Sequence, residues 1–193
     1  MLTLIGQGKR VLDIGCFDGT IAELVQRNNK VVGIDIAPKA VALARKNGVN
    51  AHVFNFEEDL LPTSFGKFDL VIAGEIIEHV FDTGGFIRKI SRILVPNGEL
   101  VLTTPNLVGL GSRLGFMFGK TPWMIENGIE GIKSGHIRYF TKETLTELLH
   151  TNGFKVEVLT CDSLGLGREM NIPFFDELLP QFGHVLIVRA RKV

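Results

Sequence analysis

The chain has 193 residues, 45% of them apolar, and its 21 lysines and arginines balance its 21 aspartates and glutamates. The apolar fraction excludes a disordered chain, the length allows one domain with a full core, and the neutral balance argues against a dedicated nucleic-acid binder. No apolar run reaches the ~18 residues of a membrane span, and the first residues lack a secretion signal. The two cysteines, Cys16 and Cys161, are far apart in the sequence, which favours a reduced chain in the cytoplasm. We therefore expect a single soluble domain over residues 1–193.

Short apolar runs alternate with helical stretches, a pattern typical of a parallel α/β sheet with helices on both faces. Thr20 and Glu23 form a T-x-x-E capping box that predicts a helix start at Thr20, and Thr141 can cap the last helix. We expect strands at 10–14, 30–35, 51–54, 68–73, 98–104, 154–160 and 184–190. We expect helices at 20–28, 38–47, 83–94 and 141–151.

Two long segments, 105–140 and 161–183, do not fit this alternation. Connections of such length inside a compact domain are usually functional. They either cover the sheet or build a lid and an acceptor pocket, and 105–140 could also contact a second copy or a protein partner. In the second segment, five apolar residues are spaced like one helical face: Phe174, Phe175, Leu178, Leu179 and Phe182.

The stretch from Val11 to Thr20 is an apolar run that ends in a glycine turn, followed by a helix. A parallel sheet holds its ligand beyond the carboxyl end of such a strand. A dinucleotide turn reads G-x-G-x-x-G, but Phe17 and Thr20 occupy the second and third glycine positions after Gly15. Twenty residues after Gly15, Asp35 offers a carboxylate that can accept both hydroxyls of a ribose. These features favour a nucleoside with an amino-acid tail over a dinucleotide.

Five blocks in order resemble the motifs of class I S-adenosylmethionine-dependent methyltransferases: LDIGCFDG, VVGIDI, FNFEEDLLP, FDLVIAGEIIEHV and ILVPNGELVLTTPN. The resemblance covers about residues 9–160. It implies S-adenosylmethionine as cofactor and a Rossmann-like sheet of seven strands in the order 3-2-1-4-5-7-6, the last strand antiparallel. By position it assigns cofactor contacts to Asp13, Gly15, Cys16 and Gly19 (methionine part), Asp35 (ribose), Ile36, Asn55, Phe56 and Glu57 (adenine), and Gly74.

Two positions depart from the family pattern. Phe17 stands where the family usually has glycine, and Asn55 where it usually has aspartate. Phe17 alters the fine geometry of the turn but not the cofactor class. The family usually has helices before the first strand, so the lid here is expected from residues 105–140 and 161–183.

A candidate metal site lies in Gly-Glu-Ile-Ile-Glu-His, where Glu75, Glu78 and His79 would share one face of a helical turn. His136 is a candidate fourth ligand, and oxygen-rich ligands favour Mg²⁺ or Mn²⁺. The motif resembles the Mg²⁺ site of small-RNA terminal 2′-O-methyltransferases and is similar to that of ubiquinone-pathway O-methyltransferases. The alternative is a structural turn without metal, in which the histidine is hydrogen-bonded.

The resemblance implies methyl transfer to a small-molecule acceptor, and we expect the acceptor atom to be a hydroxyl oxygen. His79 or His136 could serve as the general base. Four aromatic residues suggest an apolar or ring-bearing acceptor, or a lid packed on itself: Phe116, Phe118, Trp123 and Tyr139. An alternative is a non-catalytic S-adenosylmethionine-binding partner protein, since the chain also resembles MetW-like proteins. A dinucleotide-binding oxidoreductase is disfavoured by Phe17.

Overall fold

The computed structural model describes residues 1–122, 124–125, 135–162 and 179–193. The strands are β1 (Arg10–Ile14), β2 (Lys30–Asp35), β3 (Ala51–Val53), β4 (Phe68–Gly74), β5 (Leu94–Pro105), β6 (Phe154–Cys161) and β7 (Val185–Lys192). They form one sheet in the order β3-β2-β1-β4-β5-β7-β6, parallel except for β7, which is antiparallel to both neighbours. The predicted strand order is confirmed.

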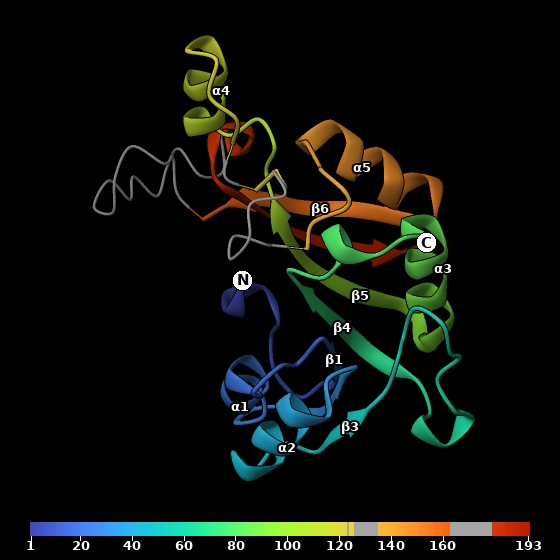
Figure 1. Cartoon of the computed structure of the whole chain (residues 1–193). Helices are drawn as coiled ribbons and strands as arrows, with labels where there is room; N and C mark the ends of the chain where they lie inside the picture. Colours follow the sequence, from blue (N-terminus) through green and yellow to red (C-terminus); the bar gives the residue numbers. More distant parts are fainter. Residues whose placement is uncertain (123, 126–134, 163–178) are drawn as a thin grey trace.

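Helices cover both faces of this sheet (Figure 1). The helices are α1 (Thr20–Val25), α2 (Pro38–Lys46), α3 (Thr83–Ile93), α4 (Leu110–Met117) and α5 (Lys142–Thr151). The described residues also form the short 3₁₀ turns η1 (Leu2–Leu4), η2 (Thr63–Phe65), η3 (Ile77–His79) and η4 (Pro180–Phe182). One core holds buried residues of α3 and α5, and the other holds buried residues of α1 and α2, because alternate residues of a strand point to opposite faces.

The arrangement of β1 fixes where a ligand can enter. β1 pairs with β2 on one side and with β4 on the other, so the strand order changes direction at β1. In parallel sheets the ligand crevice lies beyond the carboxyl ends of the strands at such a point. The turn after Ile14 therefore occupies the expected binding position.

The predicted start of α1 at Thr20 is confirmed, but the predicted capping box of Thr20 and Glu23 is not formed. The N-cap residue is Gly19, with φ +84°, rather than Thr20, and it has no side chain that could cap the helix. Asp18 takes that role locally, because its Oδ1 accepts from the Thr20 backbone N at 3.0 Å and from Thr20 Oγ1 at 2.7 Å. The Thr141 cap of α5 is confirmed, with Thr144 as its capping-box partner.

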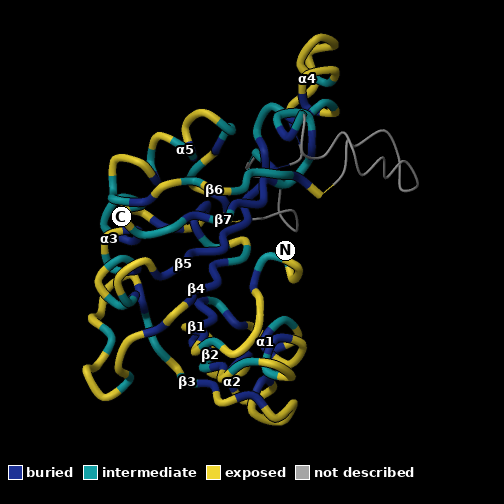
Figure 2. Tube along the Cα trace, turned by 180° about the vertical axis from the view of Figure 1, so that it is seen from behind, coloured by how far each residue is buried: buried dark blue, intermediate teal, exposed yellow. Residues whose placement is uncertain are grey.

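Two further elements, β5 and α4, differ from the prediction. β5 begins at Leu94 rather than at residue 98, and α4 lies inside the segment 105–140. Figures 1 and 2 show α4 projecting beyond the sheet, with exposed residues along most of its length. Within the described part of the chain, no helix combines the length and the apolar character that crossing a membrane requires. Trp123, Phe174, Phe175 and Leu178 lie outside the described residues.

Candidate functional site

Gly15 occupies a crowded position in the turn after β1. It adopts φ +73°, and a Cβ built there would lie 2.1 Å from Cδ1 of Ile76. The turn is tied to β2, because the backbone N–H groups of Gly15 and Cys16 donate to the Ile34 carbonyl at 2.8 and 3.1 Å. Only glycine fits both the backbone conformation and the contact with Ile76.

Two cavities meet at Gly15. The first has a volume of about 370 Å³, and its lining includes the predicted cofactor residues Asp13, Gly15, Cys16 and Gly74. The second has a volume of about 350 Å³, and its lining includes the predicted Gly15, Asp35, Ile36, Asn55, Phe56 and Glu57. Gly19 lines neither cavity and instead packs against α2, where its Cβ would lie 3.1 Å from that of Ala44. The structure thus brings nine of the ten predicted cofactor residues to one elongated site.

Asp13 carries the main electrostatic feature of the first cavity. The residue is only 4% exposed, and its Oδ2 is buried without a hydrogen-bond partner. Burial, followed by the nearby charge of Asp35, raises the pKa of the Asp13 carboxyl to about 7. A buried carboxylate oxygen without a partner is costly unless a cation or a donor reaches it. The first cavity is therefore suited to the positive end of a ligand.

Asp35 lies at the end of β2 on the edge of the second cavity. Its Oδ2 accepts from the backbone N of Phe17 at 3.0 Å, and its Oδ1 accepts from the backbone N of Ala37 at 2.8 Å. These bonds fix the carboxylate, and each oxygen keeps a second lone pair for a ligand hydroxyl.

The second cavity offers an apolar slot for a flat ring. Ile36 is 65% exposed at its edge, and Phe56 packs edge-on against Phe86 with ring centroids 5.5 Å apart. Asn55 Oδ1 accepts from the backbone N of Glu57 at 3.1 Å, and Glu57 Oε1 accepts from that of Phe81 at 2.6 Å. The polar groups of this loop therefore shape the slot through local bonds.

Cys16 takes part in the turn through its backbone. Its thiol lies against β2, because a Cβ on Gly33 would be 2.8 Å from Cys16 Sγ. Burial and the charges of Asp13 and Asp35 raise the pKa of the thiol to about 12. The raised pKa disfavours nucleophilic chemistry at this cysteine, because that chemistry requires the thiolate.

A second polar cluster lies beside the second cavity. Glu78, His79 and His136 offer ligand atoms that all lie within 4.8 Å of one another, and His79 also lines that cavity. Glu78 is 1% exposed, and its Oε2 accepts from Thr104 Oγ1 at 3.0 Å. Its Oε1 is buried without a hydrogen-bond partner, and burial, with a smaller effect of Glu75, raises the pKa of the carboxyl to about 7.

Backbone carbonyls orient both imidazoles of the cluster. His79 Nδ1 lies 3.0 Å from the Gly135 carbonyl oxygen, and His136 Nδ1 lies 3.3 Å from that of Met124. Because a carbonyl oxygen only accepts, each Nδ1 donates, and a neutral ring then carries its lone pair on Nε2. Metal-binding histidines commonly have this second hydrogen bond, so the donor set fits a cation.

Glu75 is not part of this group of three. The predicted common helical face is wrong, because the turn η3 begins at Ile77 and Glu75 precedes it with φ +52°. Its backbone N donates to the carbonyl and to Oγ1 of Thr103, at 3.1 and 3.2 Å. Thr104, the next residue of β5, contacts Glu78 and was not among the predicted site residues.

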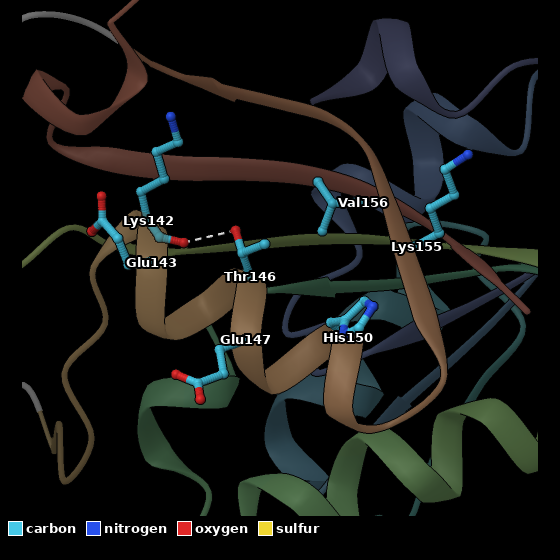
Figure 3. Close-up of a pocket in the computed structure, with 7 residues that line it drawn as sticks. All are labelled: Lys142, Glu143, Thr146, Glu147, His150, Lys155 and Val156. Carbon is cyan, nitrogen blue, oxygen red and sulfur yellow. Dashed lines mark hydrogen bonds between the residues drawn. The ribbon is translucent and has the colours of Figure 1, made fainter.

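A further cavity lies elsewhere, between α5 and β6, with a volume of about 560 Å³ (Figure 3). It is lined by side chains such as Lys142, Glu147, His150 and Lys155, and Thr146 Oγ1 donates to the Lys142 carbonyl at 2.8 Å. No buried polar atom without a partner lies among its lining residues. By contrast, the cavity at the turn after β1 is lined by Asp13, whose Oδ2 is buried without a partner.

Comparisons with known proteins agree with this geometry. Residues 1–159 match a family model described as a methyltransferase domain. A ubiquinone biosynthesis O-methyltransferase of Xanthomonas oryzae pv. oryzae is 40% identical over 105 residues, which cover 51% of this chain and 44% of that protein. A probable S-adenosylmethionine-dependent methyltransferase of Mycolicibacterium smegmatis is 31% identical over 161 residues, 82% of this chain and 55% of that protein. The chain thus spans about half the length of these curated relatives.

Solved structures share the fold. An S-adenosylmethionine-dependent methyltransferase from Mesorhizobium loti superposes with a TM-score of 0.71 at 20% identity, covering 99% of this chain and 95% of that one. An N-methyltransferase from Bradyrhizobium japonicum, in complex with S-adenosyl-L-homocysteine, gives 0.64 at 18% identity, covering 99% and 83%.

Proposed function

Since the chain belongs to the methyltransferase domain family, we propose that it transfers the methyl group of S-adenosylmethionine to a hydroxyl oxygen of a small-molecule acceptor. The observation that carries this proposal is the buried Asp13 oxygen without a partner, beside the Gly15 turn. A carboxylate in that place suits the ammonium of an amino-acid tail.

The residues present fit this cofactor along its whole length. Asp13 would hold the methionine part in the first cavity, and Asp35 would accept from the ribose hydroxyls. The slot between Ile36 and Phe56 would hold the adenine ring. Gly15 lines both cavities, so a ligand that extends from one to the other would pass along its backbone.

The chemistry needs alignment more than covalent help. S-adenosylmethionine supplies a methyl group on a sulfonium, which an acceptor oxygen attacks in line as the neutral thioether departs. Fixed positions of donor and acceptor can contribute about 7–11 kcal/mol to such a reaction.

Loss of the acceptor proton is the step that Glu78, His79 and His136 are placed to serve. We propose that these three residues hold a divalent cation, which would lower the pKa of an acceptor hydroxyl. With two imidazoles and one carboxylate, the donor set suits Mn²⁺ better than Mg²⁺, which prefers oxygen ligands. If no cation binds, His79 is the candidate base, because its ring is exposed and lines the second cavity.

The choice of oxygen as acceptor atom is supported by the Xanthomonas relative, whose name specifies O-methyl transfer. A panel of catechols and other small phenols, assayed with labelled S-adenosylmethionine, tests it directly. We expect turnover with hydroxylated rings and none with amines of similar size. Turnover with amines alone would contradict the choice of oxygen.

The metal proposal has its own experiment. Chelated protein should regain turnover with Mn²⁺, and the Glu78→Ala variant should neither bind Mn²⁺ in calorimetry nor respond to it. Glu147→Ala, which removes an acidic side chain in α5, serves as the matched control and should behave as the natural chain. Full turnover of the natural chain in excess chelator would exclude the metal.

One observation favours a second candidate, a protein that binds S-adenosylmethionine and presents residues 105–140 to a partner. α4 and the residue after it expose Leu114, Phe116, Met117 and Phe118, at 42%, 47%, 77% and 76%. A cluster of exposed large apolar side chains is typical of an interaction site. A stable co-purifying protein together with no turnover on any acceptor would favour this candidate.

A further inference from the structure

Phe17 has an unusual conformation for its residue type. Its φ is +46°, a region that glycine adopts without strain, and its side chain is 67% exposed. Holding a non-glycine residue there has a cost in backbone strain. Neither local packing nor burial of the ring offsets this cost in the free chain.

The surrounding turn holds Phe17 in place from both sides. Its backbone N donates to Asp35 Oδ2 at 3.0 Å, and the preceding thiol of Cys16 packs against Gly33. On the other side, Asp18 Oδ1 caps the first residue of α1. The strained conformation is therefore imposed by contacts of the turn that also shape the site.

Phe17 links the two parts of the proposed cofactor site. The residue lines the first cavity, which contains Asp13 and would hold the methionine part. Its backbone N contacts Asp35, the proposed ribose ligand at the second cavity. In S-adenosylmethionine the sulfonium lies between the methionine chain and the ribose. It would therefore lie near Phe17, which contacts both parts of the site.

We propose that the ring of Phe17 contacts the sulfonium of the bound donor and favours the cationic donor over the neutral product, S-adenosylhomocysteine. This inference rests on the proposed function. The face of an aromatic ring attracts a cation but gains nothing comparable from a neutral thioether. At a partly exposed site the preference corresponds to about two- to fivefold in affinity.

Calorimetric titration with each ligand separately tests the inference on the natural chain and on Phe17→Leu. Leucine keeps an apolar side chain but lacks the ring face. We expect Phe17→Leu to weaken binding of S-adenosylmethionine by about two- to fivefold and to leave the Kd of S-adenosylhomocysteine unchanged. Phe118→Leu, a 76% exposed phenylalanine that lines neither cavity, is the matched control and should change neither Kd.

The possible results separate this inference from the proposed function. An equal loss for both ligands, or no loss for either, would overturn the role of the ring while leaving the cofactor site intact. Failure of the natural chain to bind either ligand would overturn the proposed function and the inference with it. Phe17→Gly gives the same comparison if the leucine variant does not fold, because glycine adopts φ +46° without strain.

Discussion

Asp13 is a buried residue of β1 that also lines the first cavity. The residue lies on β1 between Leu12 and Ile14, which belong to the core under α3 and α5, so its side chain points to the opposite face. There it lines the first cavity, buried but without a partner for Oδ2. The fold thus keeps a carboxylate in an environment that favours its protonated form until a cation binds.

This raised pKa predicts pH-dependent cofactor binding. The Asp13 pKa is about 7 in the free chain, and a bound ammonium would lower it, so protons and ligand compete. The affinity for S-adenosylhomocysteine, which also carries an ammonium, should fall by up to about tenfold per pH unit between pH 7 and pH 5.5. Calorimetry at several pH values measures this slope.

Asp13→Asn is the matched variant, because it keeps the shape and removes the titration. It should bind the ligand more weakly at pH 7 and show a flat profile from pH 7 to pH 5.5. A variant profile as steep as that of the natural chain would assign the slope to another group.

Residue identities predicted which residues line the two cavities at Gly15 better than they predicted the cluster of Glu78, His79 and His136. Gly15, Asp35 and Asp13 follow from position, because parallel strands bring their carboxyl ends to one edge. The position of Glu75 on a common helical face was mispredicted, because helical spacing does not reveal the positive φ that precedes the turn. Thr104 carried no signal of its own, since its contact with Glu78 joins residues 26 positions apart.

At the scale of elements, the strands were predicted well and their ends less well. Apolar runs mark β1, β2 and β4 clearly, because both faces of a parallel strand are buried. The predicted start of β5 was four residues too late, because Pro96-Asn97-Gly98 is typical of a turn. In the structure the strand continues through these residues, and Asn97 adopts φ +59° at a shift in register with β4. α4 was missed because glycines at 109, 111 and 115 lower helix propensity.

Gly109, the N-cap of α4, and Gly115, inside the helix, differ in their surroundings, and two substitutions test this. A Cβ on Gly109 would lie 2.6 Å from the Gly183 carbonyl oxygen, a backbone atom, whereas a Cβ on Gly115 meets nothing closer than 3.6 Å. Gly109→Ala should therefore lower the free energy of unfolding by about 1–3 kcal/mol. Gly115→Ala should raise it by about 0.5–1 kcal/mol, because alanine favours the helix.

Urea denaturation of both variants measures these changes. Equal effects of the two substitutions would show that the close approach of Gly109 to η4 does not constrain the fold.

At the scale of the whole molecule, the sheet brings two distant parts of the chain to one place. The turn after β1 lines the proposed cofactor site. The end of 105–140 is bonded to Glu78, whose carbonyl accepts from the backbone N of Ile137 at 2.9 Å and of Arg138 at 3.0 Å. His136 is thereby held beside His79. The order of the strands was predictable from the motifs, but this contact was not, because it depends on the path of a long insertion.

Calorimetric titration with S-adenosylhomocysteine is the most direct measurement of the central claim, that the turn at Gly15 and the carboxylate of Asp35 bind this cofactor. We expect one site per chain, and an affinity reduced by about ten- to hundredfold in Asp35→Ala, which loses hydrogen bonds to a charged group. Glu58→Ala, an exposed acidic residue that lines neither cavity, should bind as the natural chain. Binding of NAD but not of S-adenosylhomocysteine, or an unchanged affinity in Asp35→Ala, would contradict the account.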